Sequence, residues 1–476
     1  MMVVEMQRGV HCRRRYAGRA AKSTATGLSC PLQRAGLIGQ EAEVSDMSTP
    51  APSLKHLASA SFRVGCLGFG GPAGQIALMH RIFVEEKRWI SEAEYLHALN
   101  YCMLLPGPEA QQLATYAGWR LNGLAGGVVA GLLFVLPGAL IVFGLTWLYA
   151  AWGTLPGVAA LFYGVKAAVI GFILEALVKV GRRALKGPQD VALAALAFLA
   201  LFLFQLPFPL VIGFAAAIGL ARSLSKPPPP PLPDTLREKM PSARKAFTAA
   251  LGWGAVWMAP LVSAFLLLGP DHVLTRVGAF FSKLAVLTFG GAYTVLAYLQ
   301  QEAVEAEGWL TAPQMIDGLG LAETTPGPLV LVNQFVGFMA GWQSDGGGLA
   351  LAAAAALMAS WCTFAPSFVW IFAGAPFSEA LRRSRLAAGI LSAVTAAVFG
   401  IIAKVAVVFG FAVLFHAAFE TQLPWGAALT LPDFAAPDLL AIAIAAVAAI
   451  ALIRLKANIV LVVIACALAG LLSLIW

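Results

Sequence analysis

Thirteen apolar segments divide most of this 476-residue chain, and they constrain its fold more than any other feature. A helix that spans a membrane needs about 20 mainly apolar residues, and a soluble core cannot hold so many segments of this kind. Charged residues make up only 12% of the sequence, which is too few to cover a water-soluble surface. The sequence therefore excludes a soluble enzyme and predicts an all-α polytopic membrane protein.

The segments form two groups of six, with one segment between the groups. They lie at 54–80, 95–118, 123–150, 157–180, 189–205 and 206–221, and at 274–300, 314–341, 348–374, 386–415, 437–453 and 457–476. The unpaired segment is 247–268. Seven crossings then separate corresponding helices, and an odd number inverts the second group. This predicts an inverted repeat of two homologous six-helix halves with about 13 spans.

Two polar stretches bound the membrane parts. Residues 1–53 contain a basic cluster that no apolar stretch follows, so they are predicted to be a disordered cytoplasmic tail and not a signal peptide. Whether residues 1–46 are translated stays open, because Met47 opens a plausible shorter chain. Residues 222–246 hold a run of five prolines, which cannot cross a bilayer and predicts a cytoplasmic linker. The remaining parts are an N-terminal membrane repeat (54–221), an extra transmembrane helix (247–268) and a C-terminal membrane repeat (269–476).

An internal duplication supports this division. Residues 69–108 align without a gap with residues 289–328, and eleven of the forty aligned pairs are identical. Shared apolar composition explains a match of Ala or Leu, but not the match of Trp89 with Trp309 or of a Pro-Gly-Pro triplet in register. We therefore interpret the two halves as copies of one unit.

The placement of Lys and Arg predicts the orientation. Membrane proteins concentrate these residues on cytoplasmic loops, and neither occurs in the predicted outer loops 151–157, 205–209, 269–273, 342–347 and 416–436. This places the N-terminus in the cytoplasm and the C-terminus outside. Residues 81–94 are the exception, because they are basic and yet fall outside in a thirteen-span arrangement. Whether 54–80 and 274–300 span fully or are re-entrant stays open.

The two Pro-Gly-Pro triplets, Pro106-Gly107-Pro108 and Pro326-Gly327-Pro328, interrupt segments that are otherwise helical. Proline removes an amide donor and restricts the preceding residue, so each triplet is predicted to end one helix and start another. A helix start exposes unpaired N–H groups and about half a positive charge, which favours an anion. The structural alternative is that each triplet is only a kink.

Two glycine pairs, Gly70-Gly71 and Gly290-Gly291, supply a second backbone opening in each repeat. In an inverted arrangement the four openings could converge near the midplane. The alternative is that these glycines only allow close helix packing.

Polar residues inside the predicted spans extend the candidate site, since such residues are costly in a membrane. Glu109, Gln112 and Tyr116 follow the first triplet on one helix face, and Asn333 and Gln334 follow the second. Glu109 lies where a carboxylate stabilises its own helix start, and proton coupling through Glu109 is an alternative role.

Lys166 lies ten residues into its segment and is a candidate cation for a bound oxyanion. Snorkelling to the membrane surface or pairing with Glu175 are the alternatives. Glu175 and Lys179 are four residues apart and are expected to form an ordinary helix pair.

Other chemistry finds no support in the sequence. The six Cys and six His residues are dispersed, so no metal site and no cofactor is predicted. The net charge of +8 is explained by basic cytoplasmic loops and needs no nucleic acid. No nucleotide-binding loop of the GxxxxGK[ST] type is present, which excludes ATP-driven pumping by this chain.

The long motifs around these residues resemble a known family. They include FGGPAGQIALMH (69–80), HALNYCMLLPGPEAQQLATYAGW (97–119), FYGVKAAV (162–169), TFGGAYTVLAYLQ (288–300) and ETTPGPLVLVNQFVGF (323–338). With these motifs the chain resembles the chromate ion transporter family, of the long two-domain type, over roughly residues 55–475.

The resemblance implies a bacterial inner-membrane secondary transporter that exports chromate and confers chromate resistance, with sulfate as a structural analogue. Membrane potential or an ion gradient would drive it, and it would not be an enzyme. The implied substrate-binding residues are Gly70, Gly71, Pro72, Pro106, Gly107, Pro108, Glu109, Gln112 and Lys166. The duplication adds Gly290, Gly291, Pro326, Gly327, Pro328 and Asn333.

Two other functions stay open. One is a carrier for sulfate or another tetrahedral oxyanion, including an inward carrier. The other, from a different class, is a membrane-embedded reductase or an assembly factor. A homodimer also stays open, since membrane carriers of this size often dimerise.

Overall fold

The computed structural model describes residues 51–225, 243–289, 292–378, 381, 384–422 and 428–474. The chain divides into two units, Met1–Pro50 and Ala51–Trp476, and every element below belongs to the second. The predicted tail up to residue 50, most of the predicted linker, and Gly290 and Gly291 lie outside the described residues.

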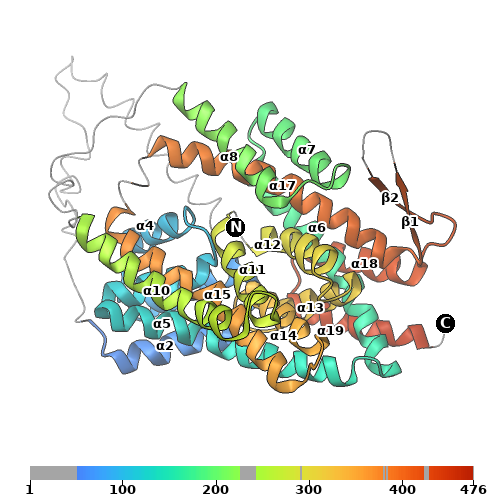
Figure 1. Ribbon diagram of the computed structural model, residues 1–476, viewed down its shortest axis with the longest axis horizontal. Coiled ribbons are helices and arrows are strands. Elements are labelled where there is room, and N and C mark those ends of the chain that lie inside the picture. Colours follow the sequence, from blue (N-terminus) through green and yellow to red (C-terminus); the bar gives the residue numbers. More distant parts are fainter. Residues whose placement is uncertain are drawn as a thin grey trace, which may run out of the picture. The chain divides into compact units, whose positions relative to one another are not determined.

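Helices form nearly all of the described part of the chain, as predicted (Figure 1). The first half contains α2 (Leu54–Leu67), α3 (Gly71–His80), the π-helix η2 (Arg81–Glu86), α4 (Glu92–Cys102), α5 (Glu109–Trp152), α6 (Pro156–Ala184), α7 (Pro188–Phe202) and α8 (Phe208–Leu224). Helix α10 (Ala243–Leu268) corresponds to the extra segment.

The second half repeats this order. It contains α11 (Val273–Leu287), α12 (Ala292–Leu299), the π-helix η3 (Gln300–Ala306), α13 (Ala312–Thr324), the 3-10 helix η4 (Leu329–Leu331), α14 (Val332–Gln343), α15 (Leu349–Gly374), η5 (Ala375–Phe377), α17 (Arg385–Leu414), α18 (Leu439–Ile453), α19 (Ile459–Gly470) and η7 (Leu471–Leu474). An antiparallel hairpin of β1 (Ala418–Gln422) and β2 (Ala428–Pro432), with Phe419 opposite Leu431, follows α17 and was not predicted from the sequence.

Local signals recur at aligned positions of the two halves. A capping box starts α4 at Ser91 and α13 at Thr311, with Glu94 and Gln314 as the reciprocal partners. A π-helix precedes each box. The duplication therefore extends from the sequence to the helix caps.

Helix α5 contains a sharp reversal at the predicted boundary between the segments 95–118 and 123–150. Asn122 and Gly123 have non-helical backbone angles, so the helix comprises two parts joined at this point. A Cβ atom added at Gly118 would collide with the backbone of Gly126, and one added at Gly131 would collide with the Thr115 hydroxyl. The two parts of α5 therefore run back along each other, as α14 and α15 do in the second half.

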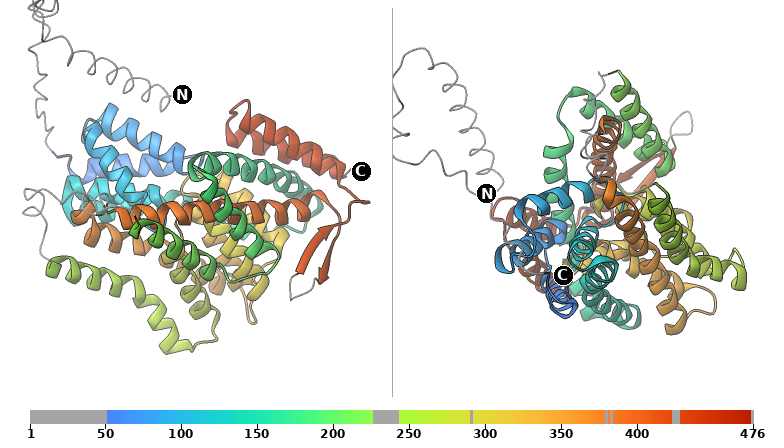
Figure 2. Two further views of the ribbon diagram at one scale, coloured as in Figure 1. Left: turned by 90° about the horizontal axis from the view of Figure 1, so that it is seen from above. Right: turned by 90° about the vertical axis from the view of Figure 1, so that its left-hand side faces the viewer.

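Helices of each half pack against helices of the other half. Helix α17 of the second half packs against α7 and α8 of the first, while α6 of the first half packs against α18 and α19 of the second (Figure 1, Figure 2). Glycines allow the close approach: a Cβ at Gly164 would collide with the Cys466 carbonyl, and a Cβ at Gly389 would collide with the Ser223 hydroxyl. Gly164 of α6 and Gly389 of α17 align at an offset of 225 residues, which also pairs Lys179 with Lys404. A glycine at the same position of each repeat therefore allows the close packing in both cases.

Apolar side chains fill two cores. The larger core gathers buried residues of α6–α8, α11–α15 and α17–α19, and the smaller one gathers residues of α2–α5 with the C-terminal part of α15. Elements of both halves contribute to each core, so neither repeat buries its apolar faces alone.

Five helices in the described residues are long and apolar enough to span a membrane, namely α5, α6, α10, α15 and α17. Helices α7, α8, α18 and α19 are apolar but shorter. The segment 54–80, expected as one span, is divided into α2 and α3 around residues 68–70. The structure thus confirms a helical membrane protein, whereas thirteen spans remain a prediction.

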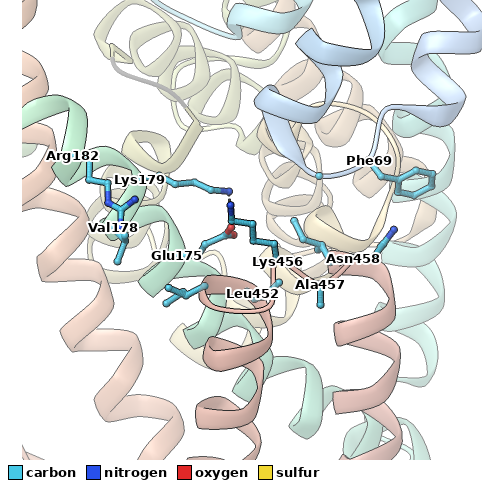
Figure 3. Close-up of a pocket in the computed structure, with 12 residues that line it drawn as sticks. Phe69, Glu175, Val178, Lys179, Arg182, Leu452, Lys456, Ala457 and Asn458 are labelled. Atoms are coloured by element: carbon cyan, nitrogen blue, oxygen red, sulfur yellow. Dashed lines mark ion pairs between the residues drawn. The ribbon is translucent and has the colours of Figure 1, made fainter. Parts of the chain in front are cut away.

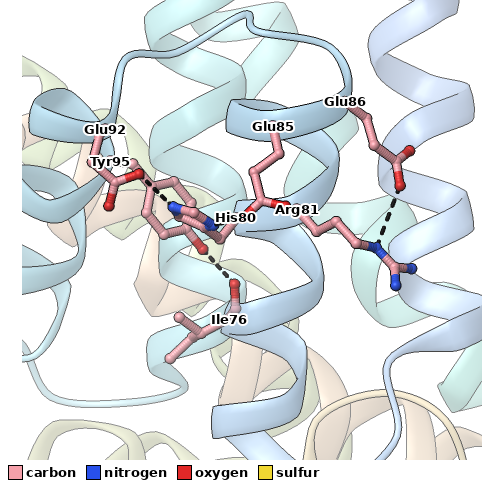
Figure 4. Close-up of polar contacts among 7 residues, drawn as sticks. All are labelled: Ile76, His80, Arg81, Glu85, Glu86, Glu92 and Tyr95. Atoms are coloured by element: carbon pink, nitrogen blue, oxygen red, sulfur yellow. Dashed lines mark hydrogen bonds and ion pairs between the residues drawn. The ribbon is translucent and has the colours of Figure 1, made fainter. Parts of the chain in front are cut away.

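Residues 81–94 lie beside Arg120, although the thirteen-span prediction places them on opposite sides of the membrane. Arg120 forms an ion pair with Glu94 at 3.1 Å, and the Asn122 side chain donates to the Pro52 carbonyl at 2.8 Å. His80 contacts Glu92 at 2.6 Å beside Tyr95 (Figure 4). The ends of segments 54–80 and 95–118 therefore lie close together.

Candidate functional site

Both Pro-Gly-Pro triplets break the helix, as predicted. Gly107 lies between α4 and α5, and Gly327 lies between α13 and η4, with nearly equal φ angles of 104° and 101°. These angles lie in the region that only glycine adopts without strain. New helices begin directly after the second prolines, at Glu109 and Leu329. The triplets are therefore turns and not kinks.

The two turns bind the opposite halves in a reciprocal way. The Gly107 amide donates to the Thr288 carbonyl at 2.9 Å, and the Gly327 amide donates to the Gly68 carbonyl at 3.1 Å. In the alignment of the two repeats, Thr288 corresponds to Gly68 and Gly327 corresponds to Gly107. Each turn is thus hydrogen-bonded to the end of the first helix of the other half.

Each turn also packs against a proline-containing helix of the other half. A Cβ at Gly138, next to Pro137 in α5, would collide with the Pro326 carbonyl. A Cβ at Gly107 would lie 4.0 Å from the Ser367 hydroxyl, next to Pro366 in α15. The structure therefore brings the first turn into van der Waals contact with a side chain of α15, and it brings the backbone of the second turn close to the backbone of α5.

This geometry corrects the expected donors. The glycine amides of both turns are already hydrogen-bonded, and proline has no amide to offer. None of the described residues accepts a hydrogen bond from the amides of residues 109–111, at the start of α5, or from those of residues 71 and 73, at the start of α3. The available N–H groups lie beside the central glycines of the turns and not on them.

Two buried glutamines hold the turns. The Gln75 side chain donates to the Gly68 carbonyl at 3.2 Å and also to the Gly327 carbonyl. The Gln112 side chain donates to the Pro106 carbonyl at 2.6 Å. Both side chains are fully buried, and their Oε1 atoms have no hydrogen-bond partner among the described residues. Each site thus retains a buried polar atom that a bound group or a water molecule can satisfy.

Lys166 is paired with an acid that the sequence reasoning missed. Its Nζ atom lies 3.8 Å from Oδ2 of Asp317, which also accepts a hydrogen bond of 2.9 Å from the Tyr149 hydroxyl. Asp317 is buried, and its Oδ1 atom has no partner among the described residues. Pairing of Lys166 with Glu175 is therefore wrong, while the expected pair of Glu175 with Lys179 is confirmed at 2.7 Å.

The remaining predicted residues lie apart from these contacts. Asn333 is buried and donates to the Thr363 hydroxyl at 3.0 Å, which links α14 to α15. Glu109 is half-buried as the first residue of α5. Gly70 and Gly71 have φ angles of 85° and 68°, and Pro72 lies in the first turn of α3.

Gly70 also lines an open cavity of about 450 Å³ (Figure 3). The cavity walls include Lys179 and Arg182 of α6 and Lys456 of the loop between α18 and α19. The structure does not place Lys166 or the Pro-Gly-Pro turns in its wall. The candidate site thus consists of a region around the turns and a separate basic cavity that opens at Gly70.

Sequence signals existed for some of the missed residues. Asp317 lies inside an apolar segment, where an acid is costly and usually functional, and Gln75 lies within the quoted motif of residues 69–80. Lys456 and Arg182 are far apart in the chain, so only the fold brings them together.

Comparison with known proteins identifies the family. The profile of the chromate transporter family matches residues 55–220 and 275–471, which cover both repeats. The chain belongs to the chromate transporter family.

Individual chromate transporters share much of the sequence. A probable chromate transport protein of Synechococcus elongatus is 32% identical over 366 residues, which cover 76% of this chain and 86% of that protein. A chromate transport protein of Pseudomonas aeruginosa is 37% identical over 301 residues, or 61% and 68% of the two chains. A chromate transport protein of Cupriavidus metallidurans is 30% identical over 361 residues, or 76% and 84%. No solved structure matches the chain.

Membership of a transporter family and the long apolar helices establish an integral membrane transport protein. Membership also implies that the chain is not an enzyme.

Proposed function

We propose that this protein exports chromate from the cytoplasm across a bacterial inner membrane as a secondary transporter and thereby confers chromate resistance. Family membership and the function named for the relatives support chromate as the substrate. The observation that carries the mechanism is the reciprocal pair of hydrogen bonds between the two Pro-Gly-Pro turns and the opposite halves.

The two halves form an inverted repeat around re-entrant hairpins. Helices α2 and α3 start and end on one side, and so do α4 and the first part of α5, because Pro52, Glu94 and Arg120 lie in one contact cluster. In the second half Gln343 contacts Gln314 at 3.3 Å, which joins the ends of α13 and α14 in the same way. This leaves nine spans, and the five crossings between corresponding helices invert the second half.

The distribution of basic residues supports this arrangement. Residues 81–94 and Arg120 now share the cytoplasmic side with residues 182–186 and 454–456. The new outer segment 301–313 contains no Lys and no Arg, as expected for an outer loop. The termini keep their predicted sides, with the N-terminus in the cytoplasm and the C-terminus outside.

The turns mark the depth at which the anion crosses. Both re-entrant tips meet midway along α5 and α15, where the starts of α3 and α5 offer unpaired amides. A tetrahedral dianion suits such amides, because a helix start carries a partial positive charge and needs no protonated side chain. The glutamine amides that hold the tips keep these helix starts in position.

The membrane potential favours export. Moving a dianion out of a cell that is negative inside releases about 4.6 kcal/mol per 100 mV, which corresponds to a concentration ratio of more than three decades. Potential alone is therefore sufficient to drive the export, and an ion gradient is not required.

Everted membrane vesicles test the proposal, since their outer face is the former cytoplasmic side. We expect them to accumulate labelled chromate above an empty-vector control and to do so faster with a potential that is positive inside the vesicle. Accumulation of sulfate in place of chromate would support the sulfate carrier, and accumulation of neither ion would contradict a transporter of tetrahedral oxyanions.

A further inference from the structure

A basic cavity lies beside the first re-entrant hairpin and is not explained by the turns. It has a volume of about 450 Å³ and is formed by three segments that are distant in the sequence. These segments are the tip at Phe69 and Gly70, the C-terminal part of α6, and residues 452–459 between α18 and α19. The cavity therefore exists only where both halves of the chain come together.

Cations outnumber acids in the wall of this cavity. Lys179 is paired with Glu175, but Arg182 and Lys456 are exposed and form no ion pair with any described residue. Figure 3 shows Lys179 and Arg182 extending from α6 and Lys456 rising from the opposite loop. Two uncompensated positive charges in one concave surface attract anions more strongly than the same charges on a flat surface.

The backbone at Lys456 indicates that its position is maintained. Its φ angle is 51°, which is one of three positive values among the described residues other than glycine. Such backbone costs energy for a residue with a Cβ atom and occurs often at ligand sites. Asn458 caps the start of α19 two residues later, with its side chain accepting from the Val460 amide at 2.9 Å. The loop is thus a defined turn that presents Lys456 to the cavity.

The inner end of the cavity reaches the start of α3. Gly70 lines the wall, and the amides of residues 71 and 73 donate to none of the described residues. A helix start of this kind continues the attraction for an anion beyond the side-chain cations. The cavity thus connects the basic side chains with the turn between α2 and α3. In this turn the Gly68 carbonyl accepts the hydrogen bond from the Gly327 amide.

We propose that this cavity is the cytoplasmic vestibule of the transporter, in which Arg182 and Lys456 collect a tetrahedral oxyanion dianion and pass it to the start of α3. The proposal rests on the proposed function for its direction. It assigns to both cations a role in the capture of substrate and none in the translocation step. Glu175 lowers the positive charge of the vestibule, because it neutralises Lys179.

Uptake of labelled chromate into everted vesicles tests this role. At low ionic strength, Arg182→Gln and Lys456→Gln are each expected to raise KM by about tenfold, with the maximal rate unchanged. At 1 M salt the Debye length falls to about 3 Å, and the difference from the parent should disappear. Glu175→Gln frees Lys179 and is expected to lower KM, which a purely structural role of Glu175 would not produce.

Lys186→Gln is the matched control, because Lys186 lies just beyond the end of α6 and does not line the cavity. We expect its KM to equal that of the parent. If the parent transports chromate and both cation variants have the same KM as the parent, the vestibule is refuted and the proposed function stands. A parent that transports no oxyanion would instead refute the proposed function.

Proteoliposomes distinguish a free oxyanion from a lipid phosphate as the occupant. The vestibule predicts the same rise in KM in purely zwitterionic lipid as in lipid with anionic headgroups. A rise that occurs only when anionic lipid is present would mean that the cavity binds lipid, and it would overturn the proposal.

Discussion

The two Pro-Gly-Pro turns share one backbone and differ in the side chains around it. Their glycines have nearly equal φ angles and donate to equivalent carbonyls of the opposite halves. Both glutamines that hold the turns come from the first half: Gln112 holds the first turn and Gln75 holds the second. Glu109 also belongs to the first half, and the aligned positions of the second half are Val295, Val332 and Leu329. The fold therefore requires the turn in both halves, and polar chemistry is concentrated in the first.

This difference separates a scaffold role from a binding role. A change to the shared backbone should affect both halves alike. A change to the side chains should matter in the first half and be tolerated in the second.

The largest effect is expected from Gly107→Val and from Gly327→Val. A β-branched residue at such a positive φ angle costs about 1–3 kcal/mol in backbone strain, and either side chain would also meet close neighbours. We expect each variant to insert into the membrane and to lose chromate uptake in everted vesicles.

Gly144→Val is the control for these variants, because nothing lies within 4 Å of an added Cβ there. Uptake should persist in this variant. If only one of the two turn variants were inactive, the turns would not be equivalent in the scaffold.

The side-chain difference is tested by Gln75→Leu against Val295→Leu. Loss of the Gln75 amide leaves buried carbonyls of Gly68 and Gly327 less satisfied, which costs about 1–3 kcal/mol. We expect a lower melting temperature of the purified protein and slower uptake for Gln75→Leu only. Equal losses in both variants would show that packing, and not hydrogen bonding, holds the tips.

The Lys166–Asp317 pair offers a coupling measurement between the halves. Removing one partner leaves the other charge unpaired in a site that is at least partly buried, so Lys166→Met and Asp317→Asn should each destabilise the protein more than the double variant. A double-mutant cycle on thermal stability should give a coupling energy of about 0.5–3 kcal/mol. Additive effects would mean that the contact between the two side chains carries no energy.

The smallest effects are expected at the two capping boxes. Ser91→Ala and Thr311→Ala each remove a cap, and each should lower stability by about 1 kcal/mol. The two losses should be similar and uptake should persist, because the caps belong to the shared scaffold. A large difference in thermal stability between the two variants would argue against that equivalence.

The sequence predicted the helical membrane class, the duplication and both breaks, because apolar segments and Pro-Gly-Pro triplets act locally. It left open whether the segment 54–80 spans fully or is re-entrant, because an apolar run has the same composition in either case, and only the structure shows the break between α2 and α3. It predicted Lys166 but missed Asp317 as its partner, since a pair between α6 and α13 depends on tertiary packing. The hairpin of β1 and β2 carried no clear signal in a segment predicted as a loop.

The most direct test of the opposed halves is the accessibility of the two matched π-helix ends to a membrane-impermeant maleimide. Lys87→Cys and Ala306→Cys place a thiol at exposed positions after η2 and within η3. We predict that, relative to the parent chain, Lys87→Cys is labelled only in everted vesicles and Ala306→Cys only in intact spheroplasts. Labelling of both thiols from the same side would contradict the inverted repeat.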